Sequence, residues 1–506
     1  MRVYFLAVLI IFLFAACGRQ NTKPNEDVAN GSIVENDNSN AEESPEADEI
    51  EPPLVVPAFN EYFARIEIDT FERTANGMSR IVFTNRTGED LNNIVIRTYL
   101  NAFAEDFYPP PFFPALERRV FRGRPNFGEM TVRHVTIDGE IIQHEHVGTI
   151  LTLFPAQTIA PDTTVQLMVQ FEANIPWIAH RTGMNANAMW FGAFLPVLAH
   201  FGENGWHTED YFAAGHPFIP MVANYHVEII TPIRYEVIGT GIRSEVLLQD
   251  TGTRITTFTA GRSRDFAFAV SSNFEQAFTE TESGIGIYFY YYSSGLDVDG
   301  ILRFIRKGME YFEQRIGAFP FSHITIAEAD FMTESAFFSQ FILVDSEHLR
   351  GSTYNGLAHA LANQWLALVV GVNRITYPWL IEGFTRYIQS GILFRTREDF
   401  LHRIQLDYES IAGRDDLYLS DGLQVYQSWN HYALAQGRKA MLMIHALCEL
   451  MGENIFWEFV NAYYLEFSFR LASAADFIRI AEEFFDESLA DFFDAWIFSG
   501  TVPNLP

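Results

Sequence analysis

The chain has 506 residues, of which 48% are hydrophobic and 15% aromatic, enough apolar surface for a large packed core and too much for a disordered chain. Acidic side chains outnumber basic ones by 64 to 34, a formal charge of −30 that argues against nucleic acid as a partner, because binding phosphate backbones needs basic patches. Two cysteines exclude a disulfide scaffold and any four-cysteine zinc site.

Residues 1–16 predict a signal peptide. A basic start precedes an apolar run from Val3 to Ala16, which is too short for a mature helix across a bilayer of about 30 Å. The run leads into Cys17 through Phe14-Ala15-Ala16, and this junction resembles a bacterial lipoprotein cleavage site. The resemblance implies a lipid on Cys17 that anchors the protein at the extracytoplasmic face of a bacterial cell membrane. An uncleaved anchor or an ordinary secretory signal is the alternative.

Residues 17–54 predict a disordered acidic tether. They are rich in Asn, Ser, Glu, Asp and Pro and contain almost no large apolar residue, a composition that cannot bury enough surface to fold. The acid-rich stretch 42–49 is repelled by anionic lipid headgroups, so we expect the tether to extend away from the membrane.

Residues 55–277 predict a β-rich domain. Short segments of alternating apolar and polar residues recur between Gly, Pro and Asn, a pattern typical of half-buried strands. Clear examples are the segments 79–84, 165–171 and 225–230.

Residues 278–506 predict a mainly helical domain, although the aromatic run 288–292 fits a strand. Apolar residues recur there at three- and four-residue spacing. The segments with this pattern are 301–316, 355–370, 380–393, 439–451 and 474–485. The expected fold class is therefore α+β, with a β-rich domain followed by a helical one.

One helical segment has the frame of a zinc site. Zinc hydrolases often take two imidazoles from positions i and i+4 of one helix, with a Glu beside the first as general base and a third ligand from a later helix. The stretch 356–365 reads Gly-Leu-Ala-His-Ala-Leu-Ala-Asn-Gln-Trp, and 379–384 reads Trp-Leu-Ile-Glu-Gly-Phe. Both resemble the membrane alanyl aminopeptidase family of zinc metallopeptidases, the gluzincins. In that register His359 falls on the first ligand and Glu382 on the third.

The resemblance covers about residues 55–504 and implies a saddle-shaped β domain followed by a thermolysin-like catalytic domain. The further segments that carry it include Ile175-Pro176, Arg181-Thr182-Gly183, Gly205-Trp206-His207, Asn224–Val227, Gly317–Phe321 and Phe492–Trp496.

The residues that perform the family's chemistry are not all present. Ala360 occupies the general-base position and has no group that accepts a proton. Asn363 replaces the second imidazole, and its neutral amide oxygen is a poor zinc ligand. The tyrosine that stabilises the reaction intermediate in the family falls on Leu434, with Tyr432 two residues away. Glu334 matches the position that binds the substrate's free amine.

These departures predict a non-catalytic pseudopeptidase that binds a peptide or protein, with no catalytic residue and no cofactor. His359 and Glu382 are then vestigial metal ligands, with Asn363 at the remaining ligand position. The alternative is a zinc aminopeptidase that removes N-terminal residues from peptides, with His359, Glu382 and either water or Asn363 on the metal and Glu334 on the substrate. A third hypothesis is a structural subunit that pairs with an active homologue.

Three further residues are interpreted as structural. His348 and His445 lie outside the motif frame and are expected at the surface or in the core. Cys448, alone on an apolar segment, is expected to be a core residue.

A polar row lies on the zinc-frame helix. Asn355, His359 and Asn363 share one face at i, i+4 and i+8, which fits either a polar cleft lining or a set of satisfied buried groups.

Overall fold

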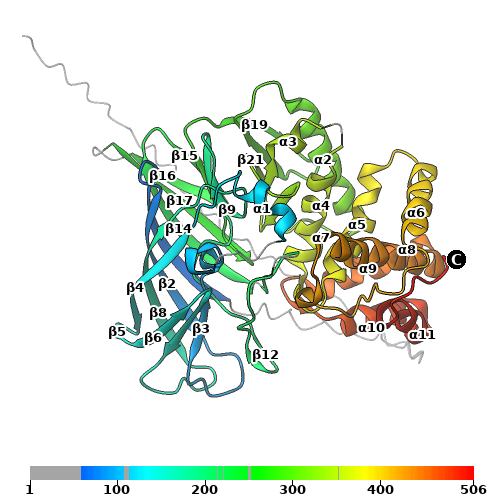
Figure 1. The fold of residues 1–506 in the computed structure, drawn as a ribbon, viewed down its shortest axis with the longest axis horizontal. Helices are drawn as coiled ribbons and strands as arrows, with labels where there is room; N and C mark the ends of the chain where they lie inside the picture. The colour runs from blue at the N-terminus through cyan, green and yellow to red at the C-terminus, as the bar shows by residue number, and fades with distance from the viewer. Residues whose placement is uncertain are drawn as a thin grey trace, which may run out of the picture. The chain divides into compact units, whose positions relative to one another are not determined.

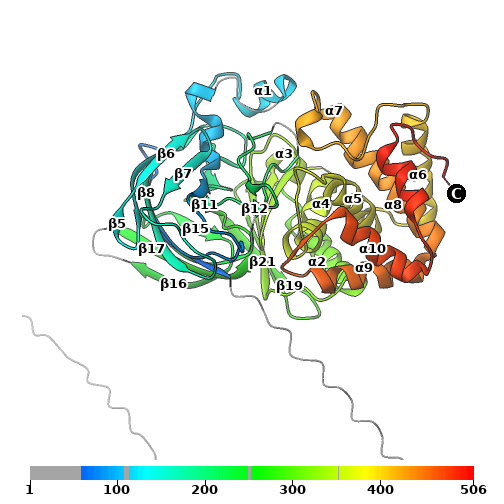
Figure 2. The ribbon, with the colours of Figure 1, turned by 90° about the horizontal axis from the view of Figure 1, so that it is seen from below.

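The computed structural model describes residues 59–107, 113–212, 215–219, 221–248, 252–351 and 353–505. The predicted signal peptide, the lipidated Cys17 and the tether 17–54 lie outside these ranges. Residues Ala58–Pro506 form one compact unit, in which Figures 1 and 2 show strands gathered at one end and helices at the other. No helix in the described ranges combines the length and the apolar character needed to cross a membrane.

The largest sheet has eight strands in the order β16-β17-β14-β1-β2-β8-β4-β5. Its strands are β1 (Asn60–Asp69), β2 (Thr74–Thr84), β4 (Glu129–Ile137), β5 (Glu140–Ile141), β8 (Thr164–Asn174), β14 (Ala223–Pro232), β16 (Ile242–Leu248) and β17 (Thr253–Ser263). The three segments predicted as strands lie within β2, β8 and β14. Buried residues alternate with more exposed ones along β8 and β14, so one face of the sheet packs into a core. β1 is central, antiparallel to β2 and parallel to β14.

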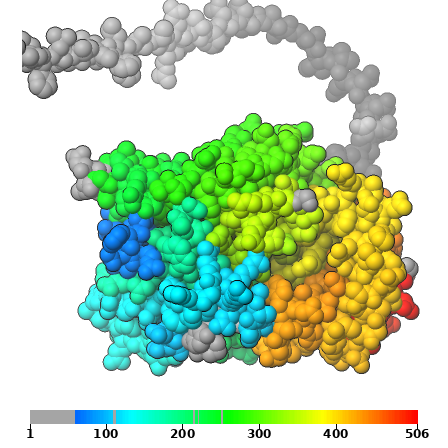
Figure 3. Space-filling view, turned by 45° about the horizontal axis from the view of Figure 1, so that its top comes forward, coloured from blue at the N-terminus to red at the C-terminus, as the bar shows by residue number. Residues whose placement is uncertain are grey.

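Smaller sheets complete the β-rich part, in the orders β15-β18-β10-β9, β11-β3-β7-β6 and β12-β13. Their strands are β3 (Ile94–Arg97), β6 (Gln143–Val147), β7 (Ile150–Phe154), β9 (Thr182–Met184), β10 (Ala188–Phe191), β11 (Val197–Leu198), β12 (Phe201–Gly202), β13 (Gly205–Trp206), β15 (Glu236–Gly239) and β18 (Phe268–Ser271). Short helical turns η1 (Tyr99–Phe103) and η2 (Glu105–Phe107) and helix α1 (Pro114–Val120) lie between β3 and β4. In Figure 3 the cyan segment that includes α1 lies beside the orange segment of the helical part.

A five-stranded sheet, ordered β19-β20-β21-β23-β22, begins the second part of the chain. Its strands are β19 (Glu275–Glu280), β20 (Gly286–Tyr291), β21 (His323–Ala329), β22 (Ser335–Phe338) and β23 (Phe341–Asp345). The predicted boundary after residue 277 falls inside β19. The sequence pattern did not predict β21, β22 or β23, because nearly every residue in them is buried and a strand covered on both faces shows no alternation.

Helices form the rest of the second part. They are α2 (Val298–Arg315), α3 (Ser346–Leu349), α4 (Asn355–Asn363), α5 (Trp379–Leu393), α6 (Arg397–Ile411), α7 (Trp429–Tyr432), α8 (Ala440–Met451), α9 (Glu453–Phe467), α10 (Ala474–Phe485) and α11 (Ala490–Phe493). Three π-helical turns are η3 (Gln364–Val369), η5 (Ala433–Lys439) and η6 (Asp494–Phe498); a 3-10 turn is η4 (Leu423–Val425), and a small sheet pairs β24 (Gly371–Val372) with β25 (Leu471–Ala472). A β-rich part followed by a helical part confirms the predicted α+β class.

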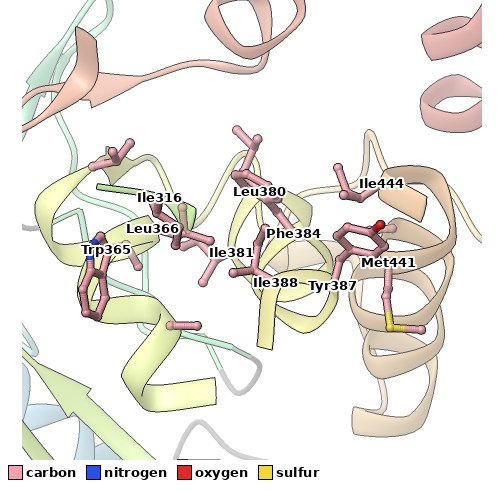
Figure 4. Packing of buried hydrophobic residues seen from close by; sticks show 14 of the residues in the cluster. Ile316, Trp365, Leu366, Leu380, Ile381, Phe384, Tyr387, Ile388, Met441 and Ile444 are labelled. Carbon is pink, nitrogen blue, oxygen red and sulfur yellow. The ribbon is translucent and has the colours of Figure 1, made fainter. Parts of the chain in front are cut away.

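Three apolar clusters hold the parts together. One fills the helical part, one lies inside the β-rich part, and the third joins them, since it contains residues such as Trp190 and Ile238 together with Phe338 and Leu343. Figure 4 shows the helical cluster around α5, where Phe384 and Tyr387 lie among apolar side chains of α5 and of α8. This packing fixes α5 between α4 and α8, which positions the candidate site.

Candidate functional site

Two polar rows face each other between α4 and α5. Asn355, His359 and Asn363 follow one face of α4 at a spacing of four. On α5, Glu382 begins a second row that continues at Thr385 and at position 389. The apolar residues of α5 point into the helical core instead (Figure 4). The motif frame predicted from the sequence therefore meets as one site across a helix pair.

His359 faces Glu382 but is held by another residue. Its Nε2 is 3.9 Å from Glu382 Oε2, which is too long for a hydrogen bond. Its Nδ1 lies 3.0 Å from Oε1 of Gln389, so the ring donates from Nδ1 and presents Nε2 toward the carboxylate. Burial lowers the pKa of His359, against the opposing effect of Glu382. The imidazole is therefore neutral at pH 7.

Both ends of the Asn363 side chain are occupied. This fully buried amide donates from Nδ2 to the His359 carbonyl at 3.0 Å, and its Oδ1 accepts from the Thr385 hydroxyl at 3.1 Å. The oxygen that a metal would need is therefore already hydrogen-bonded to a residue of α5. Of the two interpretations of the polar row on α4, the structure favours a set of satisfied buried groups at this position.

Tyr432, and not Leu434, reaches the site. Its hydroxyl donates to Glu382 Oε1 at 3.0 Å, and burial, the carboxylate and that hydrogen bond hold its pKa well above the ordinary value for tyrosine. Leu434 packs against the helical core. Arg386 on α5 places one guanidinium nitrogen 3.9 Å from Glu382 Oε2. The carboxylate therefore has a hydrogen bond from Tyr432 and an ion pair with Arg386, and neither requires a metal.

Glu334 lies at the start of α4. A Cβ at Gly356 would come within 2.2 Å of the Glu334 Cβ, so this glycine permits the close approach of the strand to the helix. Glu334 Oε1 is 3.7 Å from Nε2 of His348, and His348 in turn meets Asp345 at 3.0 Å. The carboxylate is 43% exposed, so it remains available to a ligand.

The other two residues interpreted as structural are buried. His445 is 5% exposed and Cys448 is 4% exposed. The His445 ring packs beside the rings of Tyr387 and Phe400.

The donor set does not fit a tetrahedral zinc site. Only His359 and Glu382 offer groups that zinc prefers. The Asn363 oxygen is bound to Thr385, and Tyr432 holds one oxygen of Glu382. In the part of the chain that the structure describes, no three His, Cys, Asp or Glu side chains converge on a common point. Ala360, fully buried, offers no proton acceptor.

Sequence reasoning missed Thr385, Arg386 and Gln389. A signal was present, because polar residues at i, i+3 and i+7 from Glu382 mark a polar face on an otherwise apolar helix. The sequence register assigned the tyrosine position to Leu434, two residues after Tyr432. The π-helical turn η5 begins directly after it, and a π turn holds an extra residue that alters the register.

Comparisons with known proteins agree with this geometry. Residues 332–496 match the family described as the peptidase family M1 domain. This match covers about a third of the chain, within the helical part, and it confirms the resemblance to zinc metallopeptidases inferred from the motif frame. A comparison with curated proteins gave no significant match.

Solved structures share the fold across both parts. The M1 zinc metallopeptidase from Deinococcus radiodurans has a TM-score of 0.65 at 14% identity, with 89% of this chain and 96% of that chain covered. A mutant of that metallopeptidase bound to a Tyr-Ser-Ala substrate has a TM-score of 0.66 at 15% identity with the same coverage. At this identity the likeness shows a common two-domain architecture.

Proposed function

We propose that this protein is a non-catalytic M1-fold protein that binds peptides, anchored through a lipid on Cys17 at the extracytoplasmic face of a bacterial membrane. The observation that carries the proposal is the closed hydrogen-bond network between α4 and α5. Thr385 donates to the Asn363 oxygen and Tyr432 donates to one oxygen of Glu382, so two oxygens that a metal would need are already hydrogen-bonded. Ala360 supplies no general base.

Two features support peptide as the ligand. The chain keeps the architecture of a metallopeptidase that was solved with a Tyr-Ser-Ala peptide. Glu334 stays accessible beside α4, where a carboxylate is suited to a peptide's free amine. Binding of Tyr-Ser-Ala to the full chain without release of amino acids is the expected result.

Zinc content separates this proposal from a zinc aminopeptidase with unusual ligands. One distance favours that second candidate, because two ligands on a tetrahedral zinc lie roughly 3.3 Å apart and His359 Nε2 is 3.9 Å from Glu382 Oε2. We expect the wild-type chain to hold well under one zinc per molecule after purification. Stoichiometric zinc together with chelator-sensitive release from an alanyl anilide would establish the aminopeptidase instead.

Restoring the motif tests whether the frame is intact. The double variant Ala360→Glu with Asn363→His supplies the missing base and ligand, and we expect it to take up about one zinc per chain. Adding His359→Gln to it is the matched control, which should lose that zinc. Equal zinc in the wild type and the double variant would contradict the proposal.

The anchor has its own test. Cys17→Ser should release the protein from membranes, and mass spectrometry of the wild-type N-terminus should show a lipid on Cys17. A pairing with an active homologue remains a distinct outcome, recognised by co-purification of a second M1 protein in stoichiometric amount.

A further inference from the structure

A cavity between the β-rich and the helical parts is lined by three arginines. Arg181 and Arg264 come from the β-rich part and Arg374 from the segment between α4 and α5. The volume open to the centres of water molecules in this cavity is about 40 Å³. One water needs roughly 10–15 Å³ of such volume. The cavity therefore has room for about three waters or one small polar group.

All three arginines are buried, with exposures of 5% for Arg181, 3% for Arg264 and 3% for Arg374. A guanidinium group stays protonated in proteins, so each brings a full charge into the interior. Even with its pKa lowered by burial to about 10, Arg374 is cationic at neutral pH.

Arg181 is bound by neutral groups. Its two terminal nitrogens donate to the Tyr211 hydroxyl at 3.0 Å and to the Gly215 carbonyl at 2.9 Å. The second nitrogen also lies 3.2 Å from Nδ1 of His216. Burial and the nearby arginines lower the pKa of His216, so that ring adds no charge.

Arg374 is incompletely satisfied. One terminal nitrogen donates to the Ala367 carbonyl at 2.6 Å, and the guanidinium carbon lies 5.5 Å from the centre of the Phe337 ring. Its Nε is buried without a hydrogen-bond partner among the described residues. A buried donor left unsatisfied costs about 1–3 kcal/mol. A ligand that accepts a hydrogen bond from this nitrogen would remove that cost.

The lining carries an excess of positive charge. Asp265 is the one carboxylate among the described lining residues, against three guanidinium groups. Arg264 donates to the carbonyls of Leu368 and Val369 at the end of η3, where a helix terminus offers about half a negative charge. Even without Arg264, Arg181 and Arg374 outnumber Asp265 by one charge among the described lining residues, and uncompensated buried charge is costly.

We propose that this cavity binds a carboxylate. A carboxylate matches the planar donor pairs of guanidinium groups and carries the single negative charge that the lining lacks. Apolar walls from Leu195, Ile219 and Phe337 suit the hydrocarbon of an organic acid better than a fully ionised phosphate.

Two sources can supply the carboxylate, a small free acid or the C-terminus of a bound peptide. Phe337 connects the cavity to the candidate site, since its ring centre is 4.2 Å from that of His216 and 6.1 Å from that of His359. A short peptide that extends from His359 past the Phe337 ring would bring its terminal carboxylate to the arginines. This second source rests on the proposed peptide binding, whereas the first does not.

Acetate is the first probe, added to the full chain at constant ionic strength while the unfolding temperature is measured. A saturable rise is expected, of about 3 °C at 100 times the Kd. Arg374→Gln should weaken acetate binding about 10- to 100-fold, and Arg374→Lys should restore it only in part because the planar fork is lost. Arg254→Gln, which removes an arginine paired with Glu236 on the β-rich part, is the control and should leave the acetate response unchanged.

Isothermal titration of acetate into the wild-type chain keeps the test valid if the Arg374 variants do not fold. No saturable binding by the wild type would overturn the proposal, as would equal acetate affinity in a folded Arg374→Gln chain or a response to phosphate without one to acetate. The binding of Tyr-Ser-Ala is then compared with that of its C-terminal amide to identify the source of the carboxylate. Tighter binding of the free acid than of the amide assigns the carboxylate to a peptide, and acetate binding without peptide binding leaves the cavity assignment standing while the proposed function fails.

Discussion

Asn363 shows how one amide changes what a helix pair can do. In the register of the motif it stands where an imidazole would ligate zinc, and the structure turns its oxygen toward Thr385 instead. The same atom that makes it a poor ligand makes it a good cross-link between two buried helices.

The cross-link can be measured. Asn363→Leu keeps the branched shape of the side chain but leaves the Thr385 hydroxyl without its acceptor, and we expect the free energy of unfolding to fall by about 1–3 kcal/mol. Denaturant unfolding of Asn363→Leu, Thr385→Val and the double variant completes a double-mutant cycle, which measures the interaction energy of the two side chains. The double variant should lose less than the sum of the two single losses; strict additivity would show that the hydrogen bond contributes nothing.

At the scale of single residues, the sequence predicted part of the candidate functional site. Helical spacing places His359 and Asn363 on one face, because i and i+4 positions are neighbours, whereas Ala360 and Glu382 were assigned through the resemblance to the zinc metallopeptidases. The polar face of α5 marks Gln389, but its partner His359 could not be identified in this way, since that contact depends on how far α5 is rotated against α4, which apolar packing decides.

At the scale of elements, α5 and α8 approach each other closely at Gly383. A Cβ there would lie 2.1 Å from the Cβ of Ala440 and 2.7 Å from its carbonyl carbon. The glycine in the segment Trp-Leu-Ile-Glu-Gly-Phe is therefore a packing residue that lets the helix carrying Glu382 sit against α8.

Gly383→Ala should lower the free energy of unfolding by more than about 2 kcal/mol, although alanine favours an exposed helix by about 1 kcal/mol over glycine. Gly308→Ala in α2 is the matched control. Its new Cβ would meet two side-chain methyl groups at 3.2 and 3.3 Å and a ring carbon of Phe312 at 4.0 Å, so its effect should be much smaller. Thermal unfolding of the two variants decides the matter, and equal melting temperatures would refute the close contact.

The elements themselves were predicted unevenly. Amphipathic helices such as α2 and α10 have a regular apolar stripe and were recognised. The turns η3 and η5 were not, because a π-helical turn depends on local backbone hydrogen bonds that leave little trace in the residue pattern.

At the scale of the whole molecule, neutral histidines make stability depend on pH. Burial lowers the pKa of seven of the fourteen histidines. They are His146, His180, His200, His216, His323, His359 and His445. The unfolded chain binds protons at these positions near pH 6.5, whereas the folded chain does not. Unfolding therefore takes up protons, and stability is full above pH 6.5 and falls as the pH drops below it.

Denaturant unfolding at pH values from 7.5 to 5 should show this decline. His200, whose pKa burial lowers to about 4, should contribute throughout that range, so His200→Gln should make the decline shallower. His402→Gln, at an exposed position of α6, should leave the slope unchanged. A free energy of unfolding that stays constant or rises on acidification to pH 5 would contradict the predicted direction of the pH dependence.

The parallel pairing of β1 with β14 has a consequence for how the chain is made. Asn60 finds its partner Ala223 only about 160 residues later, so during translation the middle of the largest sheet stays open until the β-rich part is nearly complete. Pairing over such a separation is slow to form. At the proposed extracytoplasmic location, a chain that crossed the membrane before folding would gain from this delay a period in which its core cannot close prematurely.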